Sequence, residues 1–453
     1  MVFSSLTFLF IFLPITLLLY YVMPSVKARN VVLLIASLLF YAWGEPIYVV
    51  LMIISVLLNY YIGRDLEKTH SKGVLAFGVI INILVLGYYK YSGFLIGSFN
   101  SVTGLNAPIR ELALPIGISF YTFQAMSYII DVYRGKSHAQ DKLLPFAVYI
   151  TMFPQLIAGP IVKYADIEAS LNNRKWRSED FAHGVLIFIK GLGKKVILAN
   201  TIGAIFESIR SGGNSELSVV TAWIGALAYT LQLFNDFSGY SDMAIGLGKM
   251  LGFTFPKNFD KPYRSLSITE FWRRWHISLG TWFREYLYIP LGGNRVNAFR
   301  QILNIIIVWT VTGLWHGAAW NFVIWGAYYG VLLVFEKFVW RRFEDKIPVP
   351  IRWLLTFVIV VIGWVIFFAE GLDDLIGYVS AMFGIGHGLV GSDSLFIVLG
   401  SLGIMALGFI PSVYEWSEKR PAWLKWVLAI LIFVVSVAFI VSDTYNPFLY
   451  FRF

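Results

Sequence analysis

The sequence predicts an all-α membrane protein, a polytopic bundle of about 11–13 transmembrane helices with additional re-entrant and interfacial helices. Hydrophobic residues make up 58% of the 453 residues and charged residues only 14%, which excludes an ordinary soluble domain. Long apolar runs recur along the chain, and about 20 such residues in a helix span a bilayer. The runs are continuous and do not alternate in short segments, so they indicate helices and not an outer-membrane barrel.

The candidate spans are distributed over the whole chain. In chain order they are residues 3–22, 31–41, 47–62, 74–89, 112–130, 146–161, 181–209, 219–234, 302–335, 354–369, 395–410 and 423–441. The sequence has no repeat of fixed period and no low-complexity segment, so we expect residues 1–453 to form a single membrane domain.

The distribution of charge predicts the orientation. The first run ends at Met23-Pro24 and has neither a basic segment before it nor a cleavage site after it, which favours an uncleaved first helix. Basic loops are retained in the cytoplasm, so Lys27 and Arg29 place the amino terminus outside. Later loops agree. The basic loops carry Arg64, Lys68, Lys72, Arg134, Lys136 and Lys142, and the acidic loop carries Glu370, Asp373, Asp374 and Asp393.

The net charge of +9 is unevenly distributed, and residues 249–300 carry nine basic side chains against Asp260, Glu270 and Glu285. The basic residues of this stretch are Lys249, Lys257, Lys261, Arg264, Arg273, Arg274, Arg284, Arg295 and Arg300. Cytoplasmic topology and contact with lipid headgroups explain such a stretch. The alternative is a surface that attracts an anionic donor. The interleaved aromatic residues are typical of the headgroup zone, and no nucleic-acid fold signature accompanies them, so we expect no nucleic-acid partner.

Several enzyme classes lack their motifs. The chain has no cysteine, which excludes disulfides, thiolate metal sites and a cysteine-linked acyl intermediate. The six histidines show no metal-ligand spacing, and there is no HExxH. Gly135-Lys136-Ser137 resembles the end of a phosphate loop, but Ile130 stands where that motif requires glycine. Ser119 and Ser238 lack the glycine pair of a nucleophile elbow. We therefore expect no metal site and no bound cofactor.

A histidine interrupts the longest apolar run. Residues 302–335 carry no formal charge and contain Trp315-His316-Gly317. One helix of that length would reach about 50 Å, against a hydrocarbon core of roughly 30 Å. With basic loops on both sides, the run predicts two crossings or a re-entrant hairpin, broken at residues 313–317. A histidine there serves either proton transfer or a hydrogen bond that holds the bundle together.

Two further polar groups are candidates for the site. Asn235, Asp236, Ser238 and Tyr240 follow the run 219–234, where they could orient an imidazole or contact a hydroxyl substrate, or could instead belong to the cap of a following helix. In the second group, Arg273 or Arg274 could bind phosphate or carboxylate, and His276 could assist proton movement. Taken alone, an interfacial amphipathic helix with snorkelling arginines explains the second group better.

At these residues the sequence becomes recognisable. The blocks FNDFSGYSDMAIGLGKMLGF, FWRRWHISLGTWFREYLYIPLGGNR and GLWHGAAWNFVIWG resemble the membrane-bound O-acyltransferase family, in particular its bacterial branch with the membrane subunit of alginate O-acetylation. FPQLIAGPIVKY and the terminal NPFLYFRF are similar too, so the resemblance covers nearly the whole chain. It implies that His316 is the principal catalytic histidine and His276 the second, with Asp236 in a matching motif. Trp315 is expected to support them.

The resemblance also implies a function. We expect a central tunnel through which an acetyl group passes from a cytoplasmic thioester, acetyl-CoA or an acyl-carrier thioester, for O-acetylation of a cell-surface polysaccharide. The expected setting is the bacterial cell membrane. The expected partners are membrane lipid, the polysaccharide and an extracellular or periplasmic acetyltransferase of the serine-hydrolase-like type. Two alternatives stay open: D-alanyl transfer to teichoic acid, and a transporter or channel that uses His316 and the polar residues near 235.

Overall fold

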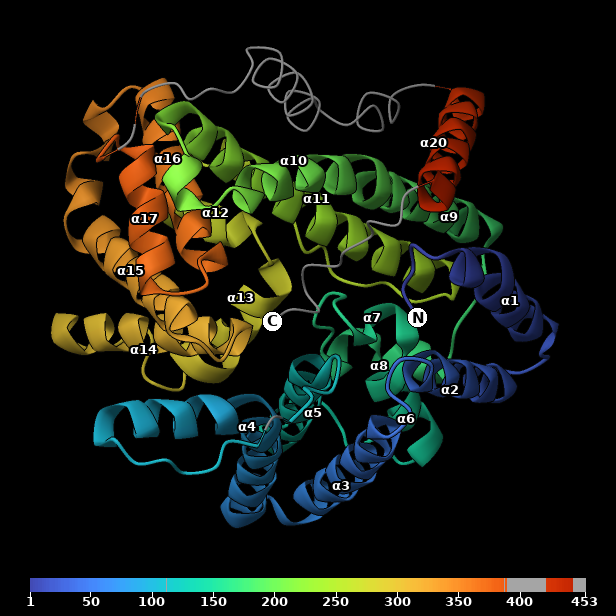
Figure 1. Cartoon of the computed structure of the whole chain (residues 1–453). Coiled ribbons are helices and arrows are strands. Elements are labelled where there is room, and N and C mark those ends of the chain that lie inside the picture. Colours follow the sequence, from blue (N-terminus) through green and yellow to red (C-terminus); the bar gives the residue numbers. More distant parts are fainter. Residues whose placement is uncertain (111, 387, 389–420, 443–453) are drawn as a thin grey trace. The chain divides into compact units, whose positions relative to one another are not determined.

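The computed structural model describes residues 1–110, 112–386, 388 and 421–442. All regular secondary structure in this part of the chain is helical, which confirms the predicted all-α class (Figure 1). The predicted span 395–410, Asp393 and the terminal NPFLYFRF sequence lie outside the described residues.

The chain divides into two compact units. The first contains Met1–Phe188 and Ser241–Lys257, and the second contains Ile189–Tyr240 and Asn258–Phe453. The expectation of a single membrane domain stays a prediction, and each unit is described separately below.

Helices build the first unit. They are α1 (Leu13–Val22), which continues a π-helical turn at Phe8–Phe12, α2 (Val26–Ala42), α3 (Tyr48–Thr69), α4 (Lys72–Thr103), α5 (Ile118–Tyr133), α6 (Leu143–Thr151), α7 (Phe153–Leu156), α8 (Tyr164–Asn172) and most of α9 (Ser178–Gly193). The predicted span 146–161 is not one helix. α6 ends at Thr151, and after Met152 α7 begins at Phe153 with Pro154 in its first turn, where the missing N–H costs nothing.

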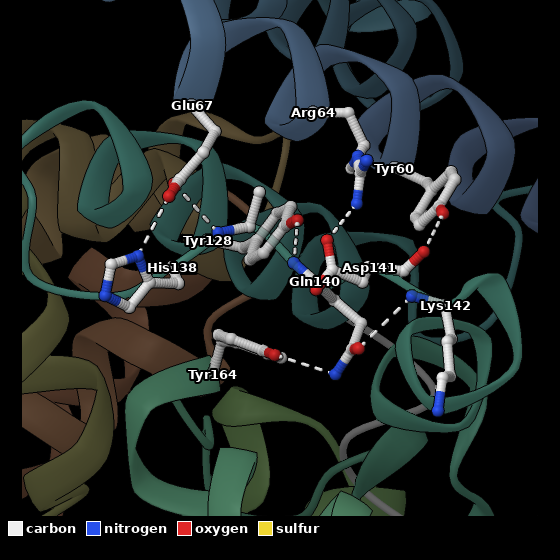
Figure 2. A network of polar contacts seen from close by, with 10 residues as sticks. Tyr60, Arg64, Glu67, Tyr128, His138, Gln140, Asp141, Lys142 and Tyr164 are labelled. Carbon is white, nitrogen blue, oxygen red and sulfur yellow. Dashed lines mark hydrogen bonds and ion pairs between the residues drawn. The ribbon is translucent and has the colours of Figure 1, made fainter.

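A polar network joins the loop after α5 to α3 and α5 in the first unit (Figure 2). The loop after α5 carries His138, whose Nδ1 lies 2.8 Å from a carboxylate oxygen of Glu67 on α3. Asp141 in the same loop pairs with Arg64 of α3. The backbone N–H of Gln140 donates to the Tyr128 hydroxyl at 3.0 Å. The loop is therefore fixed to α3 and α5 by side chains.

The second unit carries the predicted histidines. Its helices are the π-helical turn η2 (Lys194–Ala199), α10 (Asn200–Ser211), the first part of α11 (Val219–Met250), α12 (Ile268–Arg274), α13 (Ile277–Phe283), α14 (Ala298–His316), α15 (Trp320–Phe338), α16 (Val349–Phe368), α17 (Leu372–Met382) and α20 (Ala422–Ser442). In Figure 1 the helices α12 and α14–α17 run from yellow to orange.

Six of the described helices are long and apolar enough to cross a membrane. They are Tyr48–Thr69, Lys72–Thr103, Ala298–His316, Trp320–Arg342, Val349–Phe368 and Ala422–Ser442. The chain is thus a polytopic membrane protein, as predicted, and the total of about 11–13 spans stays a prediction. The predicted interruption of residues 302–335 is confirmed, because α14 ends at His316 and α15 begins at Trp320.

Glycines bring α14 and α15 together at this interruption. A Cβ at Gly313 would overlap the carbonyl oxygen of Phe322, and a Cβ at Gly326 would overlap that of Trp309. Small residues at such crossings let the two backbones touch, which is a principal source of helix association in membranes. The close crossing fixes the end of α14, and with it His316, against α15.

Candidate functional site

His276 lies in the short link between α12 and α13. Its backbone is left-handed, with φ of 46°, a conformation that costs a side-chain-bearing residue about 1–3 kcal/mol. Asn258 holds this link in place. The Asn258 carbonyl accepts the Ile277 N–H at 2.9 Å, and its side-chain oxygen accepts the Ser278 N–H at 3.1 Å. Strain of this kind is retained where the surrounding contacts overdetermine it, often at a functional site.

The same amide orients the His276 imidazole. Nδ1 of His276 lies 3.2 Å from Oδ1 of Asn258. The N–H of Ser278 donates to the same atom, which identifies it as the amide oxygen, an acceptor only. Nδ1 of His276 must therefore carry the proton, and Nε2 carries the lone pair. Burial lowers the pKa of His276 to about 3, since desolvation disfavours the imidazolium. His276 is therefore a neutral imidazole whose lone pair lies on Nε2.

His316 is the last residue of α14 and is brought next to His276. The two ring centroids are 6.5 Å apart. Both side chains are buried, with 5% exposure for His316 and 2% for His276. Trp325 at 5.1 Å and Phe367 at 5.4 Å pack edge-on against the His316 ring. Two imidazoles from distant parts of the sequence thus meet in an aromatic, largely desolvated setting.

Trp315 contacts both histidines. Its ring centroid lies 6.0 Å from that of His276 and 5.0 Å from that of His316. The side chain is 4% exposed, so its indole covers part of both imidazole rings.

The polar residues of α11 do not form the helix cap that was one of the two expectations for them. The helix continues without a break from Val219 to Met250, and residues 235–242 lie inside it. Phe237 brings this segment to the histidines, with its ring 4.7 Å from that of His276. Asn235 donates to the Leu231 carbonyl at 2.9 Å within the helix, and Tyr240 is buried.

Asp236 belongs to a buried ion pair. Its Oδ1 lies 2.8 Å from Nζ of Lys195, and the two side chains are 2% and 3% exposed. Lys195 also donates to Oδ1 of Asn200 at 3.2 Å. Its neighbour Lys194 donates to the Ser238 hydroxyl at 3.4 Å. The π-helical turn η2 therefore directs two lysines at the polar face of α11, and such turns are frequent at functional sites.

The two arginines of α12 have different surroundings. Arg274 forms an ion pair with Glu270 one turn earlier, at 2.7 Å, and also donates to the Asp260 carbonyl at 3.4 Å. Arg273 is exposed. Arg273 is therefore the better placed of the two to meet an anionic donor. Within the described part of the chain, no group of three or more His, Asp or Glu side chains is arranged to hold a metal ion.

Sequence reasoning missed Lys195 and Asn258. Lys195 left a signal, because a lysine inside the apolar run 181–209 must find a partner at membrane depth. Asn258 left none, since its contact with His276 joins residues 18 positions apart through an irregular segment.

The chain is similar to known membrane-bound acyltransferases. The profile of MBOAT, the membrane-bound O-acyltransferase family, matches residues 140–372, a range that contains both histidines and the polar segment of α11. A protein described as a probable alginate O-acetylase from Azotobacter vinelandii is 40% identical over 100% of both chains. Its counterpart from Pseudomonas aeruginosa is 39% identical over 100% of both chains. A peptidoglycan O-acetyltransferase from Helicobacter pylori is 32% identical over 100% of this chain and 98% of its own.

Proposed function

Because the chain belongs to the membrane-bound O-acyltransferase family, we propose that it moves an acetyl group from a cytoplasmic thioester across the membrane for O-acetylation of a cell-surface polysaccharide, alginate or one like it. Family membership makes the chain an O-acyltransferase and a multi-pass membrane protein, which decides against the transporter or channel considered from the sequence. The bacterial cell membrane is the proposed location.

The observation that carries this proposal is the meeting of two buried imidazoles, whose ring centroids are 6.5 Å apart. Transfer of an acyl group from a thioester to a hydroxyl requires a base for the hydroxyl proton. The hydroxyl oxygen then bonds to the carbonyl carbon, the carbon–sulfur bond breaks, and the thiolate takes up a proton. A base and a nearby second imidazole supply both proton steps.

His316 is assigned as the base and His276 as its support. His316 ends α14 at the interruption, where irregular backbone is tolerated because it is buried in protein or lines a cavity. His276 is neutral and its Nδ1 is engaged by Asn258. It can thus accept or relay a proton at Nε2, or help to position the reacting acyl group, while Trp315 keeps the two rings apart from water.

The donor is proposed to approach the cytoplasmic side through the basic stretch, residues 249–300. Exposed Arg273 is one contact available to the phosphates of acetyl-CoA or to an acidic carrier protein, and Arg274 is held nearby by Glu270. Neither thioester is favoured by the described contacts. Short loops leave little surface for a long glycan, so an extracellular or periplasmic serine-hydrolase-like acetyltransferase is proposed as the receiving partner.

Turnover in sealed vesicles tests the proposal. The purified protein would be given isotope-labelled acetyl-CoA or labelled acetyl carrier protein outside, with the soluble partner and an alginate oligosaccharide inside. We expect label on the oligosaccharide. A labelled D-alanyl carrier thioester would be tested in the same way. If only this donor labels the oligosaccharide, or if the D-alanyl group is transferred to teichoic acid, the transferred group is D-alanyl and not acetyl. If the protein consumes none of the thioesters, acyl transfer is refuted.

A further inference from the structure

Three buried hydrogen-bond donors belong to aromatic rings that pack together, and one of these rings contacts His316. They are the indole N–H groups of Trp272 and Trp325 and the hydroxyl of Tyr329, and none has a hydrogen-bond partner among the described residues. The rings touch one another, with centroids 4.8 Å apart for Trp272 and Tyr329, 5.2 Å for Trp325 and Tyr329, and 5.4 Å for Trp272 and Trp325. Trp325 and Tyr329 are fully buried. These three residues are called the donor cluster below.

The polar atoms of Trp364, Tyr263 and Tyr328, three other aromatic residues of this unit, have hydrogen-bond partners. The Trp364 indole donates to the Tyr263 hydroxyl at 3.2 Å, and that hydroxyl donates to the Thr230 carbonyl at 2.9 Å. Tyr328, next to Tyr329 on α15, donates to the Ile359 carbonyl at 2.8 Å. This packing therefore finds acceptors for buried donors elsewhere. Leaving a buried donor unpaired costs free energy, so the donor cluster requires an explanation.

The donor cluster contacts the proposed catalytic residues through Trp325. The Trp325 ring packs edge-on against His316 with centroids 5.1 Å apart. Trp272 lies on α12, next to Arg273 and four positions before His276. Gly363 leaves room at the Tyr329 hydroxyl, because a Cβ there would overlap the hydroxyl oxygen. The cluster thus joins the basic stretch of the chain to the candidate base.

We propose that Trp325 and Tyr329, together with Trp272, bind the carbonyl oxygen of the acyl group being transferred; this rests on the proposed function. The side chains of the cluster carry no formal charge and offer donors set in aromatic walls, which suits a neutral acceptor attached to a small apolar group. A carbonyl oxygen with its methyl group has that chemistry. When the hydroxyl attacks, negative charge develops on this oxygen, and fixed donors stabilise it before the thiolate leaves.

Tyr329→Phe tests the proposal with the loss of one hydroxyl. We expect the rate constant of acyl transfer, kcat, to fall by about tenfold to a hundredfold, as for the loss of a donor to a developing oxyanion. The midpoint of thermal unfolding should stay unchanged or rise, since the variant removes a buried hydroxyl that has no partner in the free protein.

Tyr328→Phe is the matched control. It removes the adjacent hydroxyl, which does have a partner in Ile359, so it should lower the unfolding midpoint and leave kcat unchanged. Transfer by Tyr329→Phe at the parent rate would overturn the proposal. So would a loss of activity accompanied by a fall in the midpoint as large as that of the control, because that result describes a structural hydroxyl.

The two indoles are tested in the same way. Trp325→Phe and Trp364→Phe both shrink a buried ring in the same cluster of aromatic residues, but only the first removes a donor without a partner. We expect the kcat of Trp325→Phe to be lower than that of Trp364→Phe by a factor of about ten or more. Equal activities would overturn the role of the Trp325 N–H.

A binding measurement separates this proposal from the proposed function. S-acetylpantetheine, the part that acetyl-CoA and acetyl carrier protein share, should raise the unfolding midpoint of the parent protein more than pantetheine does. Tyr329→Phe should lose that difference, and Tyr328→Phe should keep it. If neither the parent nor either variant transfers an acyl group but this binding pattern holds, the proposed function fails and the carbonyl site stands. If transfer occurs and Tyr329→Phe keeps the difference, the carbonyl site fails alone.

Discussion

The side-chain oxygen of Asn258 accepts hydrogen bonds from the backbone of Ser278 and lies 3.2 Å from Nδ1 of His276. One amide thus fixes the left-handed turn that precedes α13 and the tautomer of the imidazole it carries. The lone pair of His276 is left on Nε2, as the proposed proton relay requires. Asn258 is therefore a positioning residue for His276.

Asn258→Asp should change the pH dependence of acyl transfer. Burial holds the pKa of His276 at about 3, so the imidazole is neutral at every working pH. A carboxylate in place of the amide favours the imidazolium and raises that pKa. The rate should then fall as the pH drops towards the raised pKa, in a range where the parent is flat. Profiles of kcat/KM against pH for both proteins measure this, with Asn297→Asp as the control. Superimposable profiles would show that His276 takes no part in proton transfer.

Lys195→Met should destabilise the protein strongly, because it leaves the buried Asp236 carboxylate unpaired. Breaking such a pair costs about 3–5 kcal/mol. The double variant Lys195→Met/Asp236→Leu should recover much of this loss, since neither charge is then buried. Thermal unfolding of the two single variants and the double variant in detergent gives the coupling free energy. Additive losses would mean that the 2.8 Å contact contributes nothing.

Raising the pH should weaken the loop network of the first unit (Figure 2). The hydrogen bond and charge of Glu67 raise the pKa of His138 above its usual value. Because the folded-state pKa is the higher one, this contribution to stability is complete below about pH 6.5 and is lost as the pH rises through the folded-state pKa. His138→Gln should flatten the dependence of the unfolding midpoint on pH in this window. His70→Asn, at an exposed helix end, should not.

Gly313→Ala should separate α14 from α15 and reduce both stability and activity. The added methyl group would overlap the Phe322 carbonyl oxygen, which belongs to backbone and cannot move aside alone. His316, three residues further on, would shift with it. Gly87→Ala on α4 is the control, since a Cβ there meets nothing within 4 Å. Yield of monodisperse protein and acyl-transfer rate are the measurements. A Gly313→Ala protein as stable and active as Gly87→Ala would contradict the close crossing.

The sequence was informative where a feature is local. The all-α class and the break at His316 follow from runs of apolar residues and from chain length, both of which are visible in the sequence. The cap considered for the polar segment of α11 is wrong, because the helix continues unbroken from Val219 to Met250 and polar residues inside a helix have the same composition as a cap. Lys195 was a lysine in an apolar run, a signal that could have been used.

Features that depend on three-dimensional contact could not be predicted. Asn258 and His276 are joined through an irregular segment, and the rings of His276 and His316 meet only because α12, α13 and α14 pack together. Unsatisfied donors such as the Tyr329 hydroxyl are also invisible in a sequence. Whether a buried hydroxyl has a partner depends on every helix that packs around it.

The central claim is that His316 is the base in acyl transfer. Removing a general base typically costs about a hundred- to ten-thousand-fold in rate, so His316→Ala should nearly abolish transfer while the protein inserts and stays monodisperse. His276→Ala should be less severe, and Trp315→Phe milder still. The most direct measurement is the rate at which correctly inserted His316→Ala protein transfers a labelled acetyl group. The account predicts a rate at or below about a hundredth of the parent rate, and a rate above about a tenth of the parent rate would show that the histidine is structural.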